Sequence, residues 1–287
     1  MIISIVGPTG VGKTKLSVEL AKKYNAIVVN NDAMQVYKGM DIGTAKPTKE
    51  EMDGVTHCLF DFVDAKTNYT VYDYQKDARK LLEDNKDKNI VLVGGTGLYL
   101  KALLYDYNFE EETKEVNTYD DLSNEELYEL ALKKDKSMDI HINNRKRLVR
   151  FLNKENESNN NGDKLLYDNV IFIGLTTDRE NLYKRIDDRV DEMINLGLLE
   201  EVKYFYDNHI NSKATNTAIG YKELYQYFDG NISLDEAIDL IKKNSRHYAK
   251  RQYTWFNNQM NIKWFNTNYS DFNKTIDEVV NYIDTFK

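Results

Sequence analysis

Short apolar runs alternate with amphipathic stretches along much of the chain. Residues 13–24 and 72–85 place their apolar side chains at helical spacing. Four continuous apolar runs have the length expected of strands buried on both faces of a parallel sheet: IISIVG (2–7), AIVVN (26–30), NIVLVGG (89–95) and VIFIGL (170–175). The alternation of the two patterns predicts an α/β fold built on an open parallel sheet flanked by helices.

The pattern changes after Tyr105. Residues 106–142 are acidic and helix-like and contain no strand signal, and LNKENESNNNGDK (152–164) has the composition of a loop. Strand and helix patterns then resume and continue to the C-terminus. We therefore expect one α/β core with C-terminal helices, residues 1–105 and 143–287, interrupted by a helical insertion at 106–142.

Charge is distributed unevenly along the chain. The net charge of −8 over 287 residues argues mildly against a nucleic-acid partner. However, Asp and Glu are absent between Leu240 and Ser270, and RKRLVR (145–150) is a second basic run. The first of these stretches carries six cations: Lys242, Lys243, Arg246, Lys250, Arg251 and Lys263. A polyanion could bind such faces on an acidic protein.

The cysteine content and the hydropathy of the chain indicate the cellular compartment of the protein. The single cysteine, Cys58, excludes an intramolecular disulfide. No apolar stretch approaches the length of a membrane span, and the N-terminus does not resemble a signal peptide. These observations predict a cytoplasmic protein without a membrane partner, and we expect a monomer.

The first apolar run leads directly into GPTGVGKT (7–14), the phosphate-binding loop pattern. Gly7, Gly10 and Gly12 allow the unusual backbone angles of such a loop, whose N–H groups converge on phosphate oxygens. Lys13 would place a charge on the terminal phosphate and Thr14 would ligate Mg²⁺. A chance match is the alternative, but strand, loop and helix are in register. The pattern predicts a P-loop NTPase-like sheet and a phosphate or nucleotide site at Gly7, Pro8, Thr9, Gly10, Val11, Gly12, Lys13 and Thr14.

Two further strand ends carry polar residues. Asp32 follows the second apolar run, and GGTGLYL (94–100) follows the third and presents Thr96. Either residue could simply cap a helix, and local sequence leaves both alternatives open. Ligands of open α/β sheets bind at the carboxyl ends of strands, so three such ends favour one shared site. A routine ATPase is disfavoured because no apolar run ends in the Asp of a Walker-B metal site.

Six segments occur together in an order and spacing that resemble a known family. They are GPTGVGKT, DAMQVYKGMDIGTAKPT, GGTGLYLKALL, LYKRIDDRVDEMINLGLLEEV, AIGYKEL and YAKRQYTWF. The chain resembles the tRNA dimethylallyltransferases, also called tRNA isopentenyltransferases, over most of 1–105 and 141–265. The resemblance implies transfer of a dimethylallyl group from dimethylallyl diphosphate to the exocyclic amine of an adenine beside the anticodon. It also implies a Mg²⁺ cofactor and the anticodon stem-loop of tRNA as partner.

The resemblance implies roles for the matching residues. Asp32 matches the general base, and Arg189 matches an arginine that contacts the diphosphate; from the residues alone, Arg189 would be expected to pair with Asp188 or Glu192 on a helix surface. Stabilisation of the leaving diphosphate falls to Lys13, Arg189 and Mg²⁺ on Thr14. The catalytic residues implied are thus Asp32, Lys13, Thr96 and Arg189. Contact with tRNA is implied for Asp32, Ala33, Met34, Gln35, Thr96, Lys146, Arg147, Leu148, Val149 and Arg150.

The basic stretch near the C-terminus predicts a two-sided helix. One side would carry Lys243, Arg246, Lys250 and Arg251 outward, and the other would dock through Tyr248, Ala249, Trp255 and Phe256.

The chain departs from the family pattern at several positions. His57 and Cys58 stand where two histidines are usual, and we expect them to pack. Asn144 replaces an aspartate, and the basic residue expected soon after GGTGLY has only Lys114 as a candidate.

Three other functions remain open at this level. A mononucleotide (AMP, ADP or ATP) isopentenyltransferase would not need two basic faces, and a small-molecule P-loop kinase would need an Arg-rich lid. A tRNA-binding protein without catalysis would not need Lys13, Thr14 and Asp32.

Overall fold

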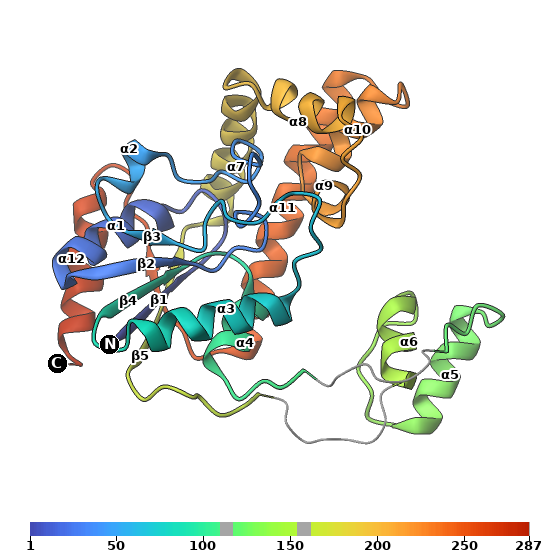
Figure 1. Ribbon diagram of the computed structural model, residues 1–287, viewed down its shortest axis with the longest axis horizontal. Coiled ribbons are helices and arrows are strands. Elements are labelled where there is room, and N and C mark those ends of the chain that lie inside the picture. The colour runs from blue at the N-terminus through green and yellow to red at the C-terminus, as the bar shows by residue number, and fades with distance from the viewer. Residues whose placement is uncertain (110–116, 154–161, 287) are drawn as a thin grey trace. The chain divides into compact units, whose positions relative to one another are not determined.

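A computed structural model describes residues 1–109, 117–153 and 162–286 (Figure 1). Contacts divide the chain into two units. The first consists of Met1–Tyr105 and Leu165–Lys287, and the second of Asp106–Lys164. Within the described residues, no helix is both long enough and apolar enough to cross a membrane.

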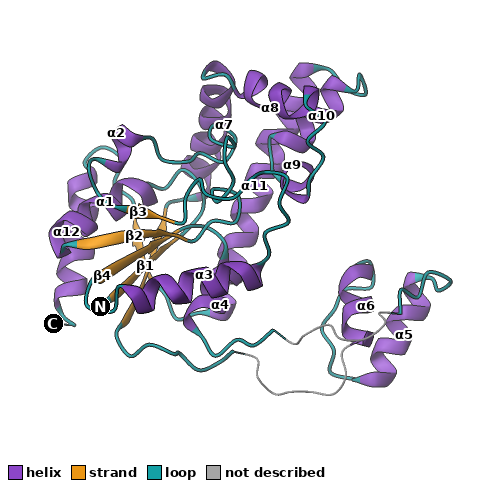
Figure 2. Cartoon of the chain, viewed as in Figure 1, coloured by secondary structure: helices purple, strands orange, loops and turns teal. Residues whose placement is uncertain are grey.

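The first unit contains one six-stranded sheet in which every pairing is parallel (Figure 2). Its strand order is β3-β2-β4-β1-β5-β6. The strands are β1 (Ile2–Val6), β2 (Ala26–Asn30), β3 (His57–Cys58), β4 (Asn89–Val93), β5 (Val170–Thr176) and β6 (Lys263–Asn266). The four strands predicted from apolar runs are confirmed. The edge strands β3 and β6 lacked a signal, because β3 has only two residues and β6 (KWFN) mixes exposed and buried positions.

Alternation along β1 supplies both faces of the sheet with core residues. Ile3 and Ile5 belong to one core cluster, with residues of α1 (Lys13–Tyr24) and α12 (Phe272–Asp284). Ile2 and Val6 belong to the other, with residues of α3 (Val71–Asp84) and α4 (Gly97–Leu104). Helices therefore cover both faces, as the open-sheet prediction requires (Figure 1).

A third core cluster lies among the helices that follow β5. Buried Val202, Phe205 and Tyr221 pack there with Val36 and Met40 from the long loop after β2. The helices are α7 (Arg179–Asn195), α8 (Leu198–Asp207), α9 (Lys213–Thr217), α10 (Tyr221–Phe228) and the 26-residue α11 (Leu234–Gln259), and α2 (Lys49–Met52) is a short helix within the loop. This cluster fixes the loop after β2 against α8 and α10.

The second unit has its own small core. Leu127 and Ala131 of α5 (Asn124–Lys134) pack against buried Leu148 of α6 (Arg145–Asn153). The insertion was expected to end at residue 142, whereas this unit extends to Lys164. The difference arises because α6, whose basic sequence was assigned to the core domain, buries its apolar side against α5.

Candidate active site

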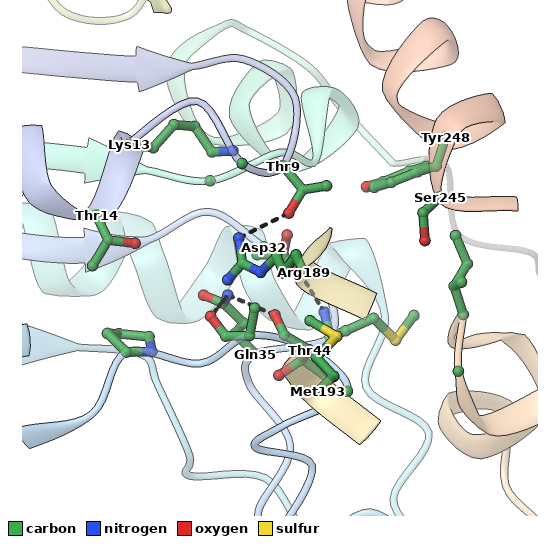
Figure 3. Close-up of a pocket in the computed structure, with 18 of the residues that line it drawn as sticks. Thr9, Lys13, Thr14, Asp32, Gln35, Thr44, Arg189, Met193, Ser245 and Tyr248 are labelled. Carbon is green, nitrogen blue, oxygen red and sulfur yellow. Dashed lines mark hydrogen bonds between the residues drawn. The ribbon is translucent and has the colours of Figure 1, made fainter. Parts of the chain in front are cut away.

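A pocket of about 700 Å³ opens at the carboxyl ends of β1, β2 and β4. The loop after β1, Asp32 after β2 and Thr96 after β4 all line it, together with residues of α7 and α11. Figure 3 shows Lys13, Asp32, Arg189 and Tyr248 around this space. The three polar strand ends singled out in the sequence are therefore brought together, and the pocket has the size of a small-molecule site.

The loop between β1 and α1 has the geometry that its glycines predict. The φ angles of Gly7, Gly10 and Gly12 are 139°, 84° and 91°, a region that other residues rarely adopt. A Cβ atom on Gly12 would lie 2.5 Å from the ring of Phe272, so α12 packs directly on the loop. Both backbone angle and space therefore require glycine at this position.

Lys13, the first residue of α1, is hydrogen-bonded back to this loop. Its Nζ donates to the carbonyl oxygen of Pro8 at 2.6 Å. Burial lowers the pKa of Lys13 to about 8, although nearby Asp32 acts in the opposite direction. A phosphate anion next to Nζ would replace the lost hydration and favour the charged form.

Asp32 is half-buried and lines the same pocket as the loop, near Lys13. Its Oδ1 accepts from the backbone N–H of Met34 at 2.9 Å, and no helix follows, so the helix-cap alternative is wrong. Burial raises the pKa of Asp32, while the Met34 bond and the charge on Lys13 limit the shift. A carboxylate with a raised pKa is the better proton acceptor.

Thr96 precedes α4 but does not cap it with its side chain. Its Oγ1 instead accepts from the backbone N–H of Ala33 at 3.0 Å, which ties the end of β4 to the end of β2. Gln252 of α11 donates to the carbonyl oxygen of Gly95 at 3.0 Å. A Cβ on Gly95 would lie 2.1 Å from that amide nitrogen, so the glycines after β4 let α11 approach closely.

Arg189 extends from α7 over the phosphate-binding loop (Figure 3). Its Nη1 donates to Thr9 Oγ1 at 3.1 Å, and burial lowers its pKa. In the described part of the chain it forms no ion pair with Asp188 or Glu192, so the surface-pair alternative is wrong. Arg189 is placed to meet an anion in the loop.

Arg185, one helical turn earlier, was missed by the sequence reasoning. Its Nε donates to the carbonyl oxygen of Gly10 at 3.0 Å, and its guanidinium lies 4.0 Å from the ring centre of Tyr269. The signal for it was the i, i+4 spacing to Arg189, which places both side chains on one face of the helix.

The side-chain amide of Gln35 is hydrogen-bonded within the loop on which the residue lies. Its Nε2 donates to the carbonyl oxygens of Thr44 at 2.9 Å and Ala45 at 3.0 Å. Both amide hydrogens are thereby used, so only the side-chain oxygen of Gln35 is left for the tRNA contact that the resemblance implies. Gln35 mainly shapes the pocket wall.

Glu201 of α8 supports the same wall of the pocket. The sequence analysis did not identify this residue. Its carboxylate accepts from the backbone N–H groups of Asp41 at 2.9 Å, Ile42 at 2.7 Å and Gly43 at 2.9 Å. Tyr221 donates to it as well, at 2.5 Å. One acidic side chain thus fixes three consecutive residues of a loop that continues into the pocket lining.

His57 was expected to pack but lines the pocket. Its Nδ1 donates to the carbonyl oxygen of Val55 at 2.9 Å, whereas Nε2 is buried and has no partner among the described residues. Burial lowers the pKa of His57, which keeps the ring neutral. Cys58, the neighbouring residue, is half-buried and packs with the α3–α4 core.

Helix α11 agrees only in part with the two-sided prediction. Ala249 and Phe256 are buried and Lys250 and Arg251 are exposed, as expected. Tyr248, however, was expected on the docked side and instead lines the pocket. The cationic side is also divided, because its member Arg246 pairs with Asp187 of α7. Lys242, a further cation of α11, pairs with Asp191 of the same helix α7.

The tRNA-contact segment of the sequence, 146–150, lies on α6 and not in the pocket. Lys146, Arg147 and Arg150 are exposed, whereas Leu148 is fully buried and its side chain is therefore unavailable to RNA. Asn144 accepts from the backbone N–H of Arg147 at 3.3 Å, as the usual aspartate could. Lys114 lies outside the described residues.

A Mg²⁺ site is compatible with the pocket. Thr14 lines it, and in the described part of the chain its hydroxyl has no hydrogen-bond partner. The same residues contain no group of three acidic, histidine or cysteine ligands. Since Mg²⁺ keeps several waters and binds diphosphate oxygens, one hydroxyl ligand fits this ion.

Comparison with known proteins identifies the family of the chain. The family model described as IPP transferase matches residues 35–259. The tRNA dimethylallyltransferase of Anoxybacillus flavithermus is 43% identical, with 99% of this chain and 96% of that protein covered.

Solved structures give the same result. The tRNA isopentenylpyrophosphate transferase of Bacillus halodurans superposes with a TM-score of 0.77 at 42% identity, covering 99% of this chain and 96% of that one. A eukaryotic dimethylallyltransferase acting on tRNA has a TM-score of 0.81 at 28% identity, covering 99% and 79%. By sequence and by fold, the chain belongs to the IPP transferase family.

Proposed function

We propose that the protein transfers a dimethylallyl group from dimethylallyl diphosphate to the exocyclic amine of the adenine adjacent to the anticodon in tRNAs, releasing diphosphate. The observation that carries the proposal is that one carboxylate, Asp32, lines the same pocket as an anion-binding loop supported by Lys13 and Arg189. A general base in one pocket with a leaving-group site is the arrangement that this transfer needs.

The loop side of the pocket would bind the donor. Backbone N–H groups of residues 7–14, with Lys13 and Arg189, would hold the diphosphate and stabilise the charge that develops as the carbon–oxygen bond breaks. A Mg²⁺ ion held by Thr14 would add positive charge to the same oxygens. Burial lowers the pKa of Lys13, and a diphosphate beside it would favour its charged form.

The part of the pocket beside Asp32 would bind the acceptor. The adenine amine is a weak nucleophile because its lone pair is delocalised into the ring, so a proton acceptor beside it assists the attack. As the nitrogen–carbon bond forms, the amine proton would pass to Asp32. An adenine can reach this pocket only when it has left its base stack, which a loop nucleotide does at modest cost.

The exposed cations of α6 would contact tRNA outside the pocket. Lys146, Arg147 and Arg150 suit backbone phosphates, and their contribution would depend on salt. We further propose a cytoplasmic monomer, whose solution mass light scattering would measure.

Incubation with dimethylallyl diphosphate, Mg²⁺ and unmodified tRNA, followed by nucleoside mass analysis, tests the function. A dimethylallyl mass gain on adenosine from tRNA, with AMP and ATP left unchanged, is expected. Modification of AMP alone would indicate a mononucleotide transferase, and ADP formed from ATP with a small acceptor would indicate a kinase.

A further inference from the structure

The side chain of His57 presents an unused hydrogen-bond acceptor to the active-site pocket. Its Nδ1 donates to the carbonyl oxygen of Val55 at 2.9 Å, and because a carbonyl can only accept, the proton of the neutral ring lies on Nδ1. Nε2 therefore carries a lone pair, and this atom is buried without a partner among the described residues. A buried polar atom costs free energy unless a donor meets it. Whatever binds beside His57 must therefore donate a hydrogen bond.

The sheet turns His57 toward the helix that begins at the phosphate-binding loop. Side chains alternate between the two faces of a strand. Cys58, the other residue of β3, packs with the α3–α4 core, whereas Val28, which pairs with His57 in the sheet, packs with α1. His57 therefore lies on the α1 side of the sheet. Thr14 and Ser17 of α1 line the same pocket as His57.

The neighbours of His57 fix its ring and add a second acceptor to the pocket lining. The ring centres of Phe60 and His57 lie 5.5 Å apart, and Phe60 also lines the pocket. The short helix α2, which contacts α1, contributes Glu51 to the same lining. Burial lowers the pKa of His57, so the ring stays neutral. A nitrogen lone pair and a carboxylate both accept hydrogen bonds, and neither can bind a diphosphate oxygen directly.

The adenine amine is a donor, but its place is on the other side of β2. The sheet order puts β3 on one side of β2 and β4 on the other. Asp32 lies against the loop after β4, because a Cβ on Gly95 would lie 3.6 Å from its Oδ2. An amine that gives its proton to Asp32 would therefore lie on the β4 side, away from His57.

Water bound to Mg²⁺ is the donor that fits the position of His57. The ion keeps several waters when it binds a diphosphate, and its proposed ligand Thr14 belongs to the helix that His57 faces. A cation polarises the water molecules on it and makes them better donors. Groups that accept hydrogen bonds from the ligands of a metal orient those ligands and strengthen its binding.

We propose that His57 Nε2 accepts a hydrogen bond from a water molecule of the Mg²⁺ ion that accompanies the diphosphate, and so positions this ion. His57 is then a positioning residue, which contacts neither the dimethylallyl group nor the adenine. The inference rests on the proposed function and extends it, because it adds β3 to the metal site for which Thr14 is the proposed protein ligand.

Binding of inorganic diphosphate, measured by calorimetry in excess Mg²⁺ and again in EDTA, isolates the contribution of the ion. His57→Phe keeps a ring against Phe60 but removes the acceptor. We expect this variant to bind diphosphate about 10- to 100-fold more weakly in Mg²⁺ and as the wild type does in EDTA. His57→Gln should regain most of the loss, because its carbonyl oxygen can accept. Cys58→Ala is the matched control, since Cys58 is the neighbouring residue of β3 and packs on the other side of the sheet.

Four results would overturn the inference. His57→Phe could gain as much affinity from Mg²⁺ as the wild type, or lose equally in Mg²⁺ and EDTA, which would make His57 structural. His57→Gln could be as weak as His57→Phe, or the wild type could gain nothing from Mg²⁺. In each case, dimethylallyl transfer to tRNA by the wild type would still uphold the proposed function, whereas absence of that transfer would reject the function itself.

Discussion

At the residue scale, the pocket shifts the pKa values of Lys13 and Asp32 in opposite directions. Burial lowers the pKa of Lys13 to about 8 and raises the pKa of Asp32. Burial disfavours whichever form is charged, and the attraction between the two groups only partly restores it. This opposition has a consequence for the pH dependence of the reaction.

We expect a bell-shaped pH profile of kcat/KM for dimethylallyl diphosphate. Activity should fall on the acid side because protonated Asp32 cannot accept a proton, at a pH above the usual aspartate pKa. It should fall again above about pH 8 as Lys13 loses its charge in the free enzyme. An active Lys13→Arg variant should lose the basic limb, since arginine does not deprotonate there; a limb that persists in this variant would assign it to another group.

Asp32→Asn separates catalysis from binding. The amide oxygen can still accept from Met34, so the fold should persist, but the base is lost and kcat should fall by about 10² to 10⁴. Binding of diphosphate, followed by calorimetry, should be retained because the loop is unaltered. An unchanged kcat would remove Asp32 from the mechanism.

Convergence of the strand ends could be predicted, because the carboxyl ends of parallel strands share an edge. Lys13, Asp32 and Thr96 therefore meet as expected. Glu201 could not be predicted, since its partners are backbone N–H groups about 160 residues away along the chain. No sequence pattern records which backbone a carboxylate will meet.

At the element scale, the loop after β2 is held in its conformation by hydrogen bonds to Glu201 of α8. Glu201→Gln would turn an NH₂ group toward backbone N–H donors whichever way the amide is oriented. We expect a loss of about 1–3 kcal/mol of stability, measured by denaturant unfolding, and a raised KM for tRNA, because the loop continues to the wall held by Gln35.

Glu200→Gln provides the control for this prediction. Glu200 is the preceding residue on α8 and is exposed, and its replacement by Gln changes the net charge by the same amount. If both variants lost equal stability, charge and not the loop contact would be the cause. If Glu201→Gln lost stability but kept the KM of the wild type, Glu201 would be structural only.

Element prediction was least accurate where a helix has more than one environment. Helix α11 carries an apolar side, two cations paired to α7 and a pocket-facing Tyr248 within a few turns. Helical spacing shows which residues share a side but not what that side meets. Similarly, α6 was assigned by its basic residues, and its buried Leu148 decided where it packs.

At the scale of the whole molecule, the two chain segments that lead into and out of the insertion are paired with each other. Tyr105 and Leu165 form an antiparallel bridge, and Leu166 donates to the carbonyl oxygen of Leu104 at 2.8 Å. The two ends of Asp106–Lys164 are therefore adjacent, and the sheet and pocket lie entirely in the other unit. A short linker can close this junction.

Replacing 106–164 with a Gly/Ser linker should leave a folded protein that binds diphosphate as the wild type does. Its affinity for tRNA and the salt dependence of binding should fall, because the exposed cations of α6 are lost. The full-length triple variant Lys146→Ala, Arg147→Ala, Arg150→Ala is the control that keeps the insertion. Unchanged RNA binding in both proteins would show that the insertion does not contact tRNA.

The sequence by itself determined the four inner strands of the sheet, the phosphate-binding loop and the polar strand ends, because each depends on periodicity or backbone chemistry within a few residues. Only the tertiary structure decided which cations of α11 are already paired, which glutamate holds the loop after β2 and which face of the sheet His57 occupies. Those outcomes depend on contacts between segments far apart in the chain, and the physical reason is packing: a side chain's role is set by the neighbours that the fold brings to it.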